Sequence, residues 1–229
     1  MRLILFDLDG TLIDSQKIFV HSILAALSRL GISNVFSERD IAKLFGKPLL
    51  NVIESLGVQR ETESVVQLYR EEYFHRRHSL ALFPGVLDLL DFLREEKFIM
   101  TLVTNRSTDV AKEIADEVKI LEYFSHILGT DEYKPKPNPD MLIAAMKLNS
   151  TNQANTIFVG DSEADYIASQ ACGVKFVRFL NSKGQWDDAL SFESSGAKLV
   201  ISNWKELRSI AIRFEALLEE SPVTERSEK

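Results

Sequence analysis

From residue 86 onwards, the sequence alternates between short apolar runs and segments of roughly ten residues with helical periodicity. Strands that alternate with helices of this length form βα units, and such units build a parallel sheet. The pattern therefore predicts an α/β core. The expected strands are 98–103, 126–129, 156–161, 174–180 and 198–202, and the expected helices are 86–96, 108–118, 139–149, 163–172 and 204–220.

One more strand is expected at the start of the chain, because residues 2–6 (RLILF) form the continuous apolar run of a central strand buried on both faces. Helical periodicity follows over 15–30 and 37–79, without a strand pattern in between. The first strand is thus separated from the rest of its sheet by a helical insertion. The predicted domains are an α/β core of 1–14 and 82–229, an inserted all-helical cap of 15–81, and a disordered polar tail of 221–229.

The composition excludes several classes of partner. With 229 residues, 45% of them hydrophobic, the chain can bury a sizeable core. Its net charge of −7 argues against a nucleic-acid-binding surface and against a polybasic membrane patch. A negatively charged ligand would instead need local cations. Whether the protein is a monomer or a homodimer is left open.

A cytoplasmic location is expected from three features. The single cysteine, Cys172, excludes an internal disulfide and fits a reducing compartment. The apolar run at the start is too short for a signal peptide. No stretch approaches the ~18 apolar residues that a membrane-spanning helix requires.

Polar residues stand directly after three of the predicted strands. In a parallel sheet, the ligand crevice lies at the carboxyl ends of the strands, so these residues are expected to converge on one rim. A nearby loop adds two lysines. The residues are Asp7 and Asp9 after 2–6, Thr104 and Asn105 after 98–103, Asp161 and Asp165 after 156–161, and Lys134 and Lys136 in the loop before 139–149.

The clustered aspartates point to a metal ion. Two unit charges ~4 Å apart repel by roughly 1 kcal/mol in water and ~4 kcal/mol at an effective dielectric constant of 20. A divalent cation removes this repulsion, and Mg²⁺ suits one or two carboxylates together with water and a substrate phosphate oxygen. Lys136 and Thr104 would then bind the remaining phosphate oxygens. The residues alone therefore predict a Mg²⁺ site that holds a phosphate group.

Four segments resemble the ordered motifs of the haloacid dehalogenase-like phosphatases. They are FDLDGTLIDS (6–15), LVTN (102–105), KPNPD (136–140) and VGDSEAD (159–165). The helical insertion after the first strand resembles the branch that contains phosphoglycolate phosphatases. The resemblance implies a Rossmann-like parallel sheet with an inserted all-helical cap. It also implies a Mg²⁺-dependent phosphomonoester hydrolase for a small phosphorylated metabolite, with phosphoglycolate as a candidate.

The resemblance also implies roles for the two leading aspartates. Asp7 is the implied nucleophile, which attacks phosphorus and forms an aspartyl-phosphate. Asp9 is the implied general acid, which protonates the leaving oxygen and then activates water. For this purpose Asp9 must be protonated when substrate binds, which is expected from its like-charged neighbours. Gly10 permits the tight turn that follows, and Thr11 is expected to tie that turn to Asp9.

The implied ligand sets are as follows. Mg²⁺ would be held by Asp7, Asp161 and the main-chain carbonyl of Asp9, with Asp165 acting through a water. The phosphate clamp would consist of Thr104, the Asn105 backbone and Lys136. Lys136 is preferred over Lys134 because Asn138 and Pro139 predict a helix N-terminus just after it and because the family pattern aligns there.

Other activities remain open at this stage. An acid at Asp9 disfavours dehalogenation, and Thr11 stands where related sugar phosphomutases usually carry valine. The alternatives are a sugar phosphomutase, an inorganic pyrophosphatase, and a non-enzymatic signalling or scaffold module that only accepts a phosphoryl group. Lys47, beside a predicted turn in the cap, is a candidate contact for a substrate carboxylate.

Overall fold

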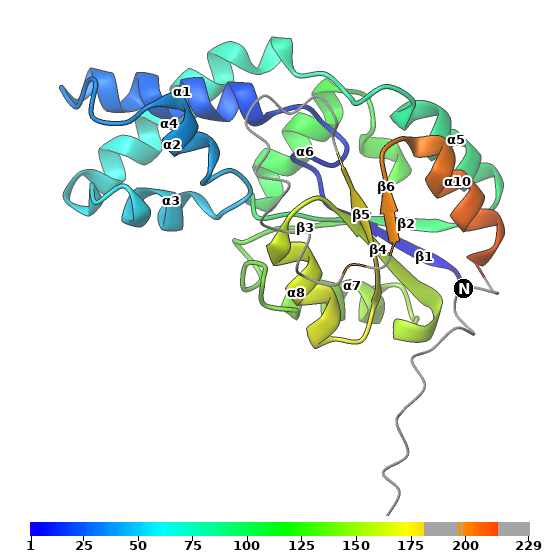
Figure 1. The fold of residues 1–229 in the computed structure, drawn as a ribbon. Coiled ribbons are helices and arrows are strands. Elements are labelled where there is room, and N and C mark those ends of the chain that lie inside the picture. The colour runs from blue at the N-terminus through cyan, green and yellow to red at the C-terminus, as the bar shows by residue number, and fades with distance from the viewer. Residues whose placement is uncertain (181–196, 198, 215–229) are drawn as a thin grey trace, which may run out of the picture.

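A computed structural model describes residues 1–180, 197 and 199–214 of the chain. Within these residues, six strands form one parallel sheet in the order β3-β2-β1-β4-β5-β6 (Figure 1). This arrangement confirms the predicted α/β fold. The strands are β1 (Leu3–Phe6), β2 (Ile99–Val103), β3 (His126–Leu128), β4 (Thr156–Gly160), β5 (Lys175–Phe179) and β6 (Leu199–Ile201).

The first strand lies at the centre of the sheet. β1 pairs with β2 on one side and with β4 on the other, although both partners are distant in the sequence. Phe6 stands opposite Leu102 in β2 and Val159 in β4. The three strands therefore end at the same level, and the residues that follow them meet at one edge.

Helices cover both faces of the sheet. Side chains of β1 alternate between the two faces, as the period of a strand requires. Ile4 and Phe6 belong to the core cluster that includes helices α5, α6 and α10, whereas Leu3 and Leu5 belong to the cluster that includes α7 and α8. The bounds of these helices are α5 (Val86–Glu95), α6 (Thr108–Glu117), α7 (Asp140–Leu148), α8 (Glu163–Ala171) and α10 (Trp204–Ile212).

The segment between β1 and α5 is helical, as its periodicity predicts. Figure 1 shows the helices of residues 15–81 gathered to one side of the sheet. Its apolar side chains continue the core cluster that covers one face of the sheet. We call residues 15–81 the helical insert; that they form a separate cap domain remains a prediction. The main helices of the insert are α1 (Gln16–Arg29), α2 (Glu38–Ala42), α3 (Leu49–Ser55) and α4 (Thr62–Arg76).

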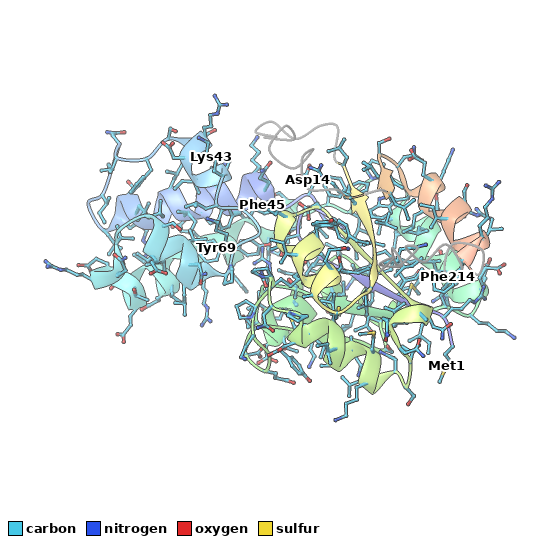
Figure 2. The ribbon with its side chains drawn as sticks, turned by 60° about the horizontal axis from the view of Figure 1, so that its bottom comes forward. Met1, Asp14, Lys43, Phe45, Tyr69 and Phe214 are labelled. Carbon is cyan, nitrogen blue, oxygen red and sulfur yellow. The ribbon has the colours of Figure 1, made fainter. Side chains whose placement is uncertain are left out.

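Two short connections join the helical insert to the core. They run side by side: Asp14 donates its N–H to the Ala81 carbonyl at 2.9 Å, and Phe83 donates to the Leu12 carbonyl at 2.9 Å. Ile13 and Leu82 form an antiparallel bridge between these two bonds. Asp14, labelled in Figure 2, thus lies where the insert meets the core.

Most of the observed elements begin and end within a few residues of the predicted ones. Helix α10 ends at Ile212, and residues 215–220 of the predicted helix 204–220 lie outside the described residues. One helix begins later than expected, because α7 starts at Asp140 and not at Pro139. The Asn138 side chain accepts from the Asp140 N–H at 3.0 Å, but the residue at the N-cap position is Pro139, one residue later than predicted. The predicted tail at 221–229 lies outside the described residues. Among the residues described, no helix has both the length and the apolar character that crossing a bilayer would require.

Candidate active site

Asp7 lies at the carboxyl end of β1 and is anchored on both sides. Its backbone N–H donates to the Val159 carbonyl at 2.9 Å, which continues the pairing with β4 by one residue. Its Oδ1 accepts from Lys136 Nζ at 2.7 Å. Asp7 is buried and lines a cavity, so its carboxylate stands at the floor of a ligand-sized space.

Lys136 reaches Asp7 from a loop that is 129 residues away in the sequence. Its ammonium also contacts Asp165 Oδ1 at 2.6 Å and donates to the Val103 carbonyl at 2.9 Å. Its side chain is 2% exposed, whereas that of Lys134 is 72% exposed and lies 3.9 Å from Asp140. The structure therefore places Lys136, and not Lys134, among the aspartates.

The Asn105 side chain positions this lysine. Its Oδ1 accepts from the Lys136 N–H at 2.8 Å, and its Nδ2 donates to the Lys136 carbonyl at 3.2 Å. The same Nδ2 donates to the carbonyl of Gly46, in the helical insert, at 3.0 Å. Asn105 thus joins the lysine loop to the insert through its side chain, a contact that differs from the backbone role expected of it.

Asp161 and Asp165 follow β4, and each is held by local hydrogen bonds. Asp165 forms a capping box with Ser162 at the start of α8, which leaves its Oδ1 for Lys136. Asp161 Oδ1 accepts from Thr11 Oγ1 at 2.9 Å. The expectation that Thr11 ties its turn to Asp9 is therefore wrong, because the hydroxyl reaches across to β4 instead.

Gly10 makes this approach possible. Its φ of +81° lies in the left-handed region, and a Cβ atom built on it would stand 2.4 Å from Asp161 Oδ2. A side chain at this position would clash with the carboxylate as well as strain the backbone. The glycine between the leading aspartates and Thr11 therefore lets the first loop close over Asp161.

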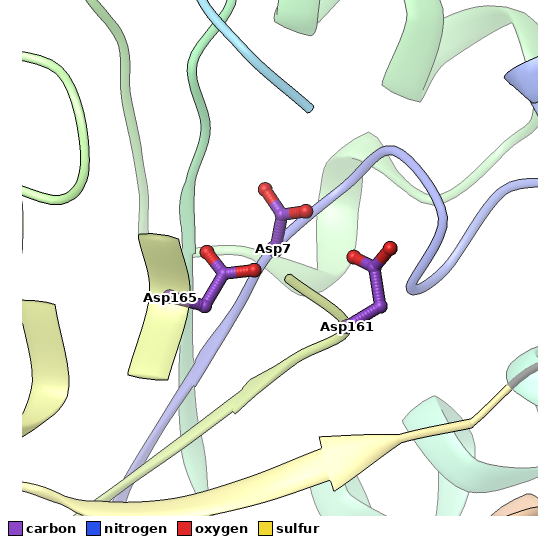
Figure 3. Close-up of side chains that lie close together, drawn as sticks. All are labelled: Asp7, Asp161 and Asp165. Carbon is purple, nitrogen blue, oxygen red and sulfur yellow. The ribbon is translucent and has the colours of Figure 1, made fainter. Parts of the chain in front are cut away.

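Asp7, Asp161 and Asp165 form an acidic cluster, whose ligand atoms all lie within 4.8 Å of one another (Figure 3). Lys136 supplies one positive charge against these three carboxyl groups. Oxygen ligands at this spacing, with excess negative charge, suit a hard divalent cation such as Mg²⁺. The donor set therefore fits the metal that the sequence predicts.

The protonation of the cluster reflects this crowding. Burial raises the pKa of Asp7 to about 7, and the Lys136 ammonium limits the rise. Burial and the neighbouring carboxylates of Asp7 and Asp165 raise the pKa of Asp161 well above its usual range. For Lys136, burial favours the neutral amine, but the two contacting carboxylates outweigh it and raise the pKa. The carboxylates of the cluster therefore repel one another, and a bound cation would relieve this repulsion.

Asp9 is turned away from the acidic cluster and forms a two-pronged ion pair with Arg106. Arg106 Nε lies 2.5 Å from Asp9 Oδ2, and Nη2 lies 2.7 Å from Oδ1. Ser15 Oγ donates to the same Oδ1 at 2.5 Å. Although burial opposes ionisation, the guanidinium holds the pKa of Asp9 below its usual value. The expectation of a protonated Asp9 is wrong for this conformation, because Arg106 outweighs the like-charged neighbours.

Thr104 stands at the end of β2, beside these groups. It is buried, and its Oγ1 accepts from the Arg106 N–H at 3.2 Å. Its own N–H donates to the Leu128 carbonyl at 3.0 Å, so β3 fixes the strand end. Thr104 and Asn105 both line the same cavity as Asp7. The structure thus brings Asp7, Asp9, Thr104, Asn105, Lys136, Asp161 and Asp165 to one edge of the sheet; their individual roles remain predictions.

A cavity of about 840 Å³ lies between the core and the helical insert. Its core side carries Asp7, Asp9 and Arg106, and its insert side is rich in apolar and aromatic side chains. Phe45 and Tyr69, labelled in Figure 2, belong to the insert side and both pack against Phe19. Further lining residues from the insert are Lys47, Leu49, Leu50, Val66, Arg70, Tyr73, Phe74, Arg77 and Leu80.

Arg106 is a candidate functional residue that the sequence prediction does not include. It directly follows LVTN, at the end of a strand whose other residues were identified. Its place in the sequence could have identified it, because a cation at the end of a strand can pair with the aspartates expected at the same edge of the sheet. The sequence prediction assigns the charge that offsets the aspartates to the metal, and so gives Arg106 no role.

The fold and this edge define a class: Rossmann-like α/β proteins with a buried aspartate cluster at the carboxyl ends of the strands. The sequence profile of the family described as haloacid dehalogenase-like hydrolase matches residues 4–179. Phosphoglycolate phosphatase 1 of Pseudomonas aeruginosa is 35% identical over 215 residues, which cover 90% of this chain and 78% of that protein. The chain therefore belongs to the haloacid dehalogenase-like hydrolase family.

Other known proteins agree with this assignment. The phosphoglycolate phosphatase of Aquifex aeolicus is 28% identical over 177 residues, covering 76% of this chain and 83% of that protein. A hydrolase from Pseudomonas syringae has a similar structure, with a TM-score of 0.78, 25% identity, and coverage of 93% of this chain and 99% of that one. A haloacid dehalogenase-like family protein from Streptococcus pneumoniae, 22% identical, shares the fold with a TM-score of 0.79 over 92% of this chain and 98% of its own.

Proposed function

We propose that this protein is a Mg²⁺-dependent phosphomonoester hydrolase that acts on a small phosphorylated metabolite through an aspartyl-phosphate intermediate. The observation that carries the proposal is the contact of Lys136 with Asp7, 2.7 Å, beside Asp161 and Asp165 at the carboxyl edge of the sheet. The names of the relatives make phosphoglycolate the first substrate to test.

In the proposed mechanism, the Asp7 carboxylate attacks phosphorus. A new P–O bond forms to Asp7, and the bond between phosphorus and the ester oxygen breaks. Asp9 gives a proton to the departing oxygen and later accepts one from the water that hydrolyses the aspartyl-phosphate. Because Arg106 holds Asp9 as a carboxylate, that contact must loosen and Asp9 must take up a proton from solvent before it can protonate the departing oxygen.

Residues around Asp7 would bind the phosphate group. The Lys136 ammonium and the Thr104 hydroxyl are buried beside the nucleophile, so they can pair with phosphate oxygens without first ordering a flexible side chain. The Asn105 backbone would complete this clamp, while the Asn105 side chain keeps Lys136 in place. Preorganised hydrogen-bond donors of this kind stabilise the charge that develops during phosphoryl transfer.

The acidic cluster would hold the metal. Asp7, Asp161 and the main-chain carbonyl of Asp9 would bind Mg²⁺, with Asp165 acting through a water. When bound, Mg²⁺ neutralises charge on the phosphate and on the aspartates that surround it. These residues fit the ion because they supply oxygen donors and an excess of negative charge.

The helical insert is proposed to act as a cap domain of residues 15–81 over a core of 1–14 and 82–229. The paired connections at 12–14 and 81–83 would be its hinges, since both short connections between the two parts lie there and only two backbone hydrogen bonds and one bridge join them. Closure would exclude water during attack and bring the insert's cavity wall against the leaving group. The partner of this site is a small phosphorylated molecule, and the proposed location is cytoplasmic.

The proposal predicts metal-dependent phosphate release. The purified protein is assayed for orthophosphate with phosphoglycolate, a hexose phosphate, pyrophosphate and p-nitrophenyl phosphate, in Mg²⁺ and in chelator. We expect hydrolysis of phosphomonoesters in Mg²⁺ and its loss in chelator. Asp161→Asn should raise the Mg²⁺ concentration required by about 10- to 100-fold or more, since it removes a ligand. Asp88→Asn, which changes an exposed carboxylate on α5, should leave that requirement unchanged.

Other outcomes of the same assay contradict the proposal. Isomerisation of the hexose phosphate without free phosphate would indicate a phosphomutase. Hydrolysis confined to pyrophosphate would indicate a pyrophosphatase. A protein that takes up one phosphoryl group and releases no phosphate would be a phospho-accepting signalling module. Equal rates in Mg²⁺ and in chelator would rule out the metal.

A further inference from the structure

Arg106 occupies an unusual place in the cavity wall, because its guanidinium is both nearly buried and paired with a candidate catalytic group. Its side chain is 13% exposed, and it contacts both oxygens of Asp9. Tyr73, from α4 of the helical insert, accepts from Nη2 at 3.0 Å. The Arg106 guanidinium carbon also lies 4.4 Å from the centre of the Tyr73 ring. Core and insert thus hold this cation together.

This cation lies close to the position of the leaving group. In the proposed function, the ester oxygen of the leaving group must come within hydrogen-bond reach of Asp9. Arg106 holds the same carboxylate, so the atoms one or two bonds beyond the ester oxygen come close to its guanidinium. A guanidinium presents parallel N–H donors in a planar fork, which matches a carboxylate in both spacing and charge.

Resting on that proposed function, we propose that Arg106 determines specificity by binding an anionic group, a carboxylate in the first instance, one or two carbons from the ester oxygen of the substrate. Binding proceeds by exchange: the guanidinium releases the Asp9 carboxylate and takes the substrate carboxylate. The substrate class is therefore the phosphate esters of short hydroxy acids.

The exchange explains how Asp9 becomes available. The guanidinium is paired before and after the exchange, so the cost of leaving this cation buried and unpaired does not arise. Once released from Arg106, Asp9 can meet the ester oxygen. A neutral leaving group has no anion that could replace Asp9 on the guanidinium. Arg106 then stays paired with Asp9, and kcat/KM for such a substrate is low.

Other cations of the cavity are weaker candidates for this role. Lys47 and Arg70 line the cavity from the insert, but both residues are exposed. Arg77, also from the insert, is half-buried and pairs with Glu117 at 3.7 Å. Exposed cations remain hydrated, and their ion pairs contribute little. Arg106 is nearly buried, held by Tyr73, and adjacent to Asp9, so it is already oriented toward the reacting oxygen.

The test compares two substrates of nearly equal size, phosphoglycolate and 2-hydroxyethyl phosphate, which differ in a carboxylate and a hydroxymethyl group. For the wild-type enzyme in Mg²⁺, we expect kcat/KM to be at least about 30-fold higher for phosphoglycolate. Arg106→Met should lower kcat/KM for phosphoglycolate by roughly 10²- to 10³-fold. For 2-hydroxyethyl phosphate it should change kcat/KM by less than about tenfold, so the preference collapses.

Two further variants separate the role of the guanidinium from general effects of a substitution. Arg106→Lys keeps the charge but loses the fork, and should retain part of the preference. If circular dichroism shows that Arg106→Met does not fold, the comparison of the two substrates is made with Arg106→Lys. Arg29→Met is the matched control, because Arg29 is an exposed arginine of the insert that pairs with Glu71 and Glu72. This substitution should leave kcat/KM unchanged for both substrates.

The outcomes separate this inference from the proposed function. If both Arg106 variants lower kcat/KM equally for the two substrates, Arg106 merely positions Asp9 and the inference is overturned. A wild-type enzyme that hydrolyses both substrates equally well overturns it too, while the phosphatase proposal stands. If neither substrate nor p-nitrophenyl phosphate yields phosphate, the proposed function itself fails, and the inference fails with it.

Discussion

Replacing Asp7 by asparagine is expected to lower kcat by about 10⁴-fold or more, because the amide cannot supply the oxygen nucleophile of the proposed reaction. The fold should survive. Asparagine has nearly the same size, and Lys136 keeps its contacts with Asp165 and with the Val103 carbonyl. Removing one carboxylate also relieves repulsion within the acidic cluster.

The measurement is steady-state phosphate release together with thermal unfolding of the same preparation. Asp88→Asn provides the matched control, since it makes the same chemical change on the exposed face of α5. It should leave both the rate and the melting temperature unchanged. An Asp7→Asn enzyme with near wild-type turnover would contradict the assignment of the nucleophile.

Replacing Lys136 by methionine should affect stability as well as catalysis. Lys136 is the cation in contact with Asp7 and Asp165, and its removal leaves buried carboxylates without compensation. Breaking a buried pair by removing one partner typically costs about 3–5 kcal/mol. We therefore expect a loss of this size in the free energy of unfolding, measured by urea denaturation in chelator, and loss of phosphatase activity in Mg²⁺.

Lys134→Met makes the same change two residues earlier in the same loop. Because that side chain is exposed, its effect on the free energy of unfolding should stay within about 0.5 kcal/mol. Equal effects of the two substitutions would show that Lys136 is not the buried partner of Asp7. Loss of stability at Lys136 with full activity would remove it from the phosphate clamp.

Much of the fold can be predicted from the sequence, because hydrophobic periodicity is a local signal. The apolar run before Asp7 and the one before Asp161 both form strands, and they pair side by side across a long sequence separation. The position of the site follows from topology, since the carboxyl ends of parallel strands share one edge. Lys136 is identified by the family pattern, and the structure brings it to Asp7.

The remaining details depend on contacts between distant segments. The pairing of Asp9 with Arg106 joins residues 97 apart in the sequence, and it reverses the expected direction of the Asp9 pKa. Thr11 turns to Asp161 across 150 residues of sequence. Tyr73 reaches Arg106 from the helical insert. Periodicity carries no information about such partners, because each contact depends on how segments distant in the sequence pack against one another.

In the proposed mechanism, Asp7 carries the phosphoryl group during turnover. Its most direct test is acid quenching of the enzyme while it turns over phosphoglycolate in Mg²⁺, followed by peptide mass spectrometry. We predict that the mass of one phosphoryl group appears on the peptide that contains Asp7 and is missing from the same peptide of Asp7→Asn. A phosphoryl group found on another residue, while the enzyme releases phosphate, would contradict it.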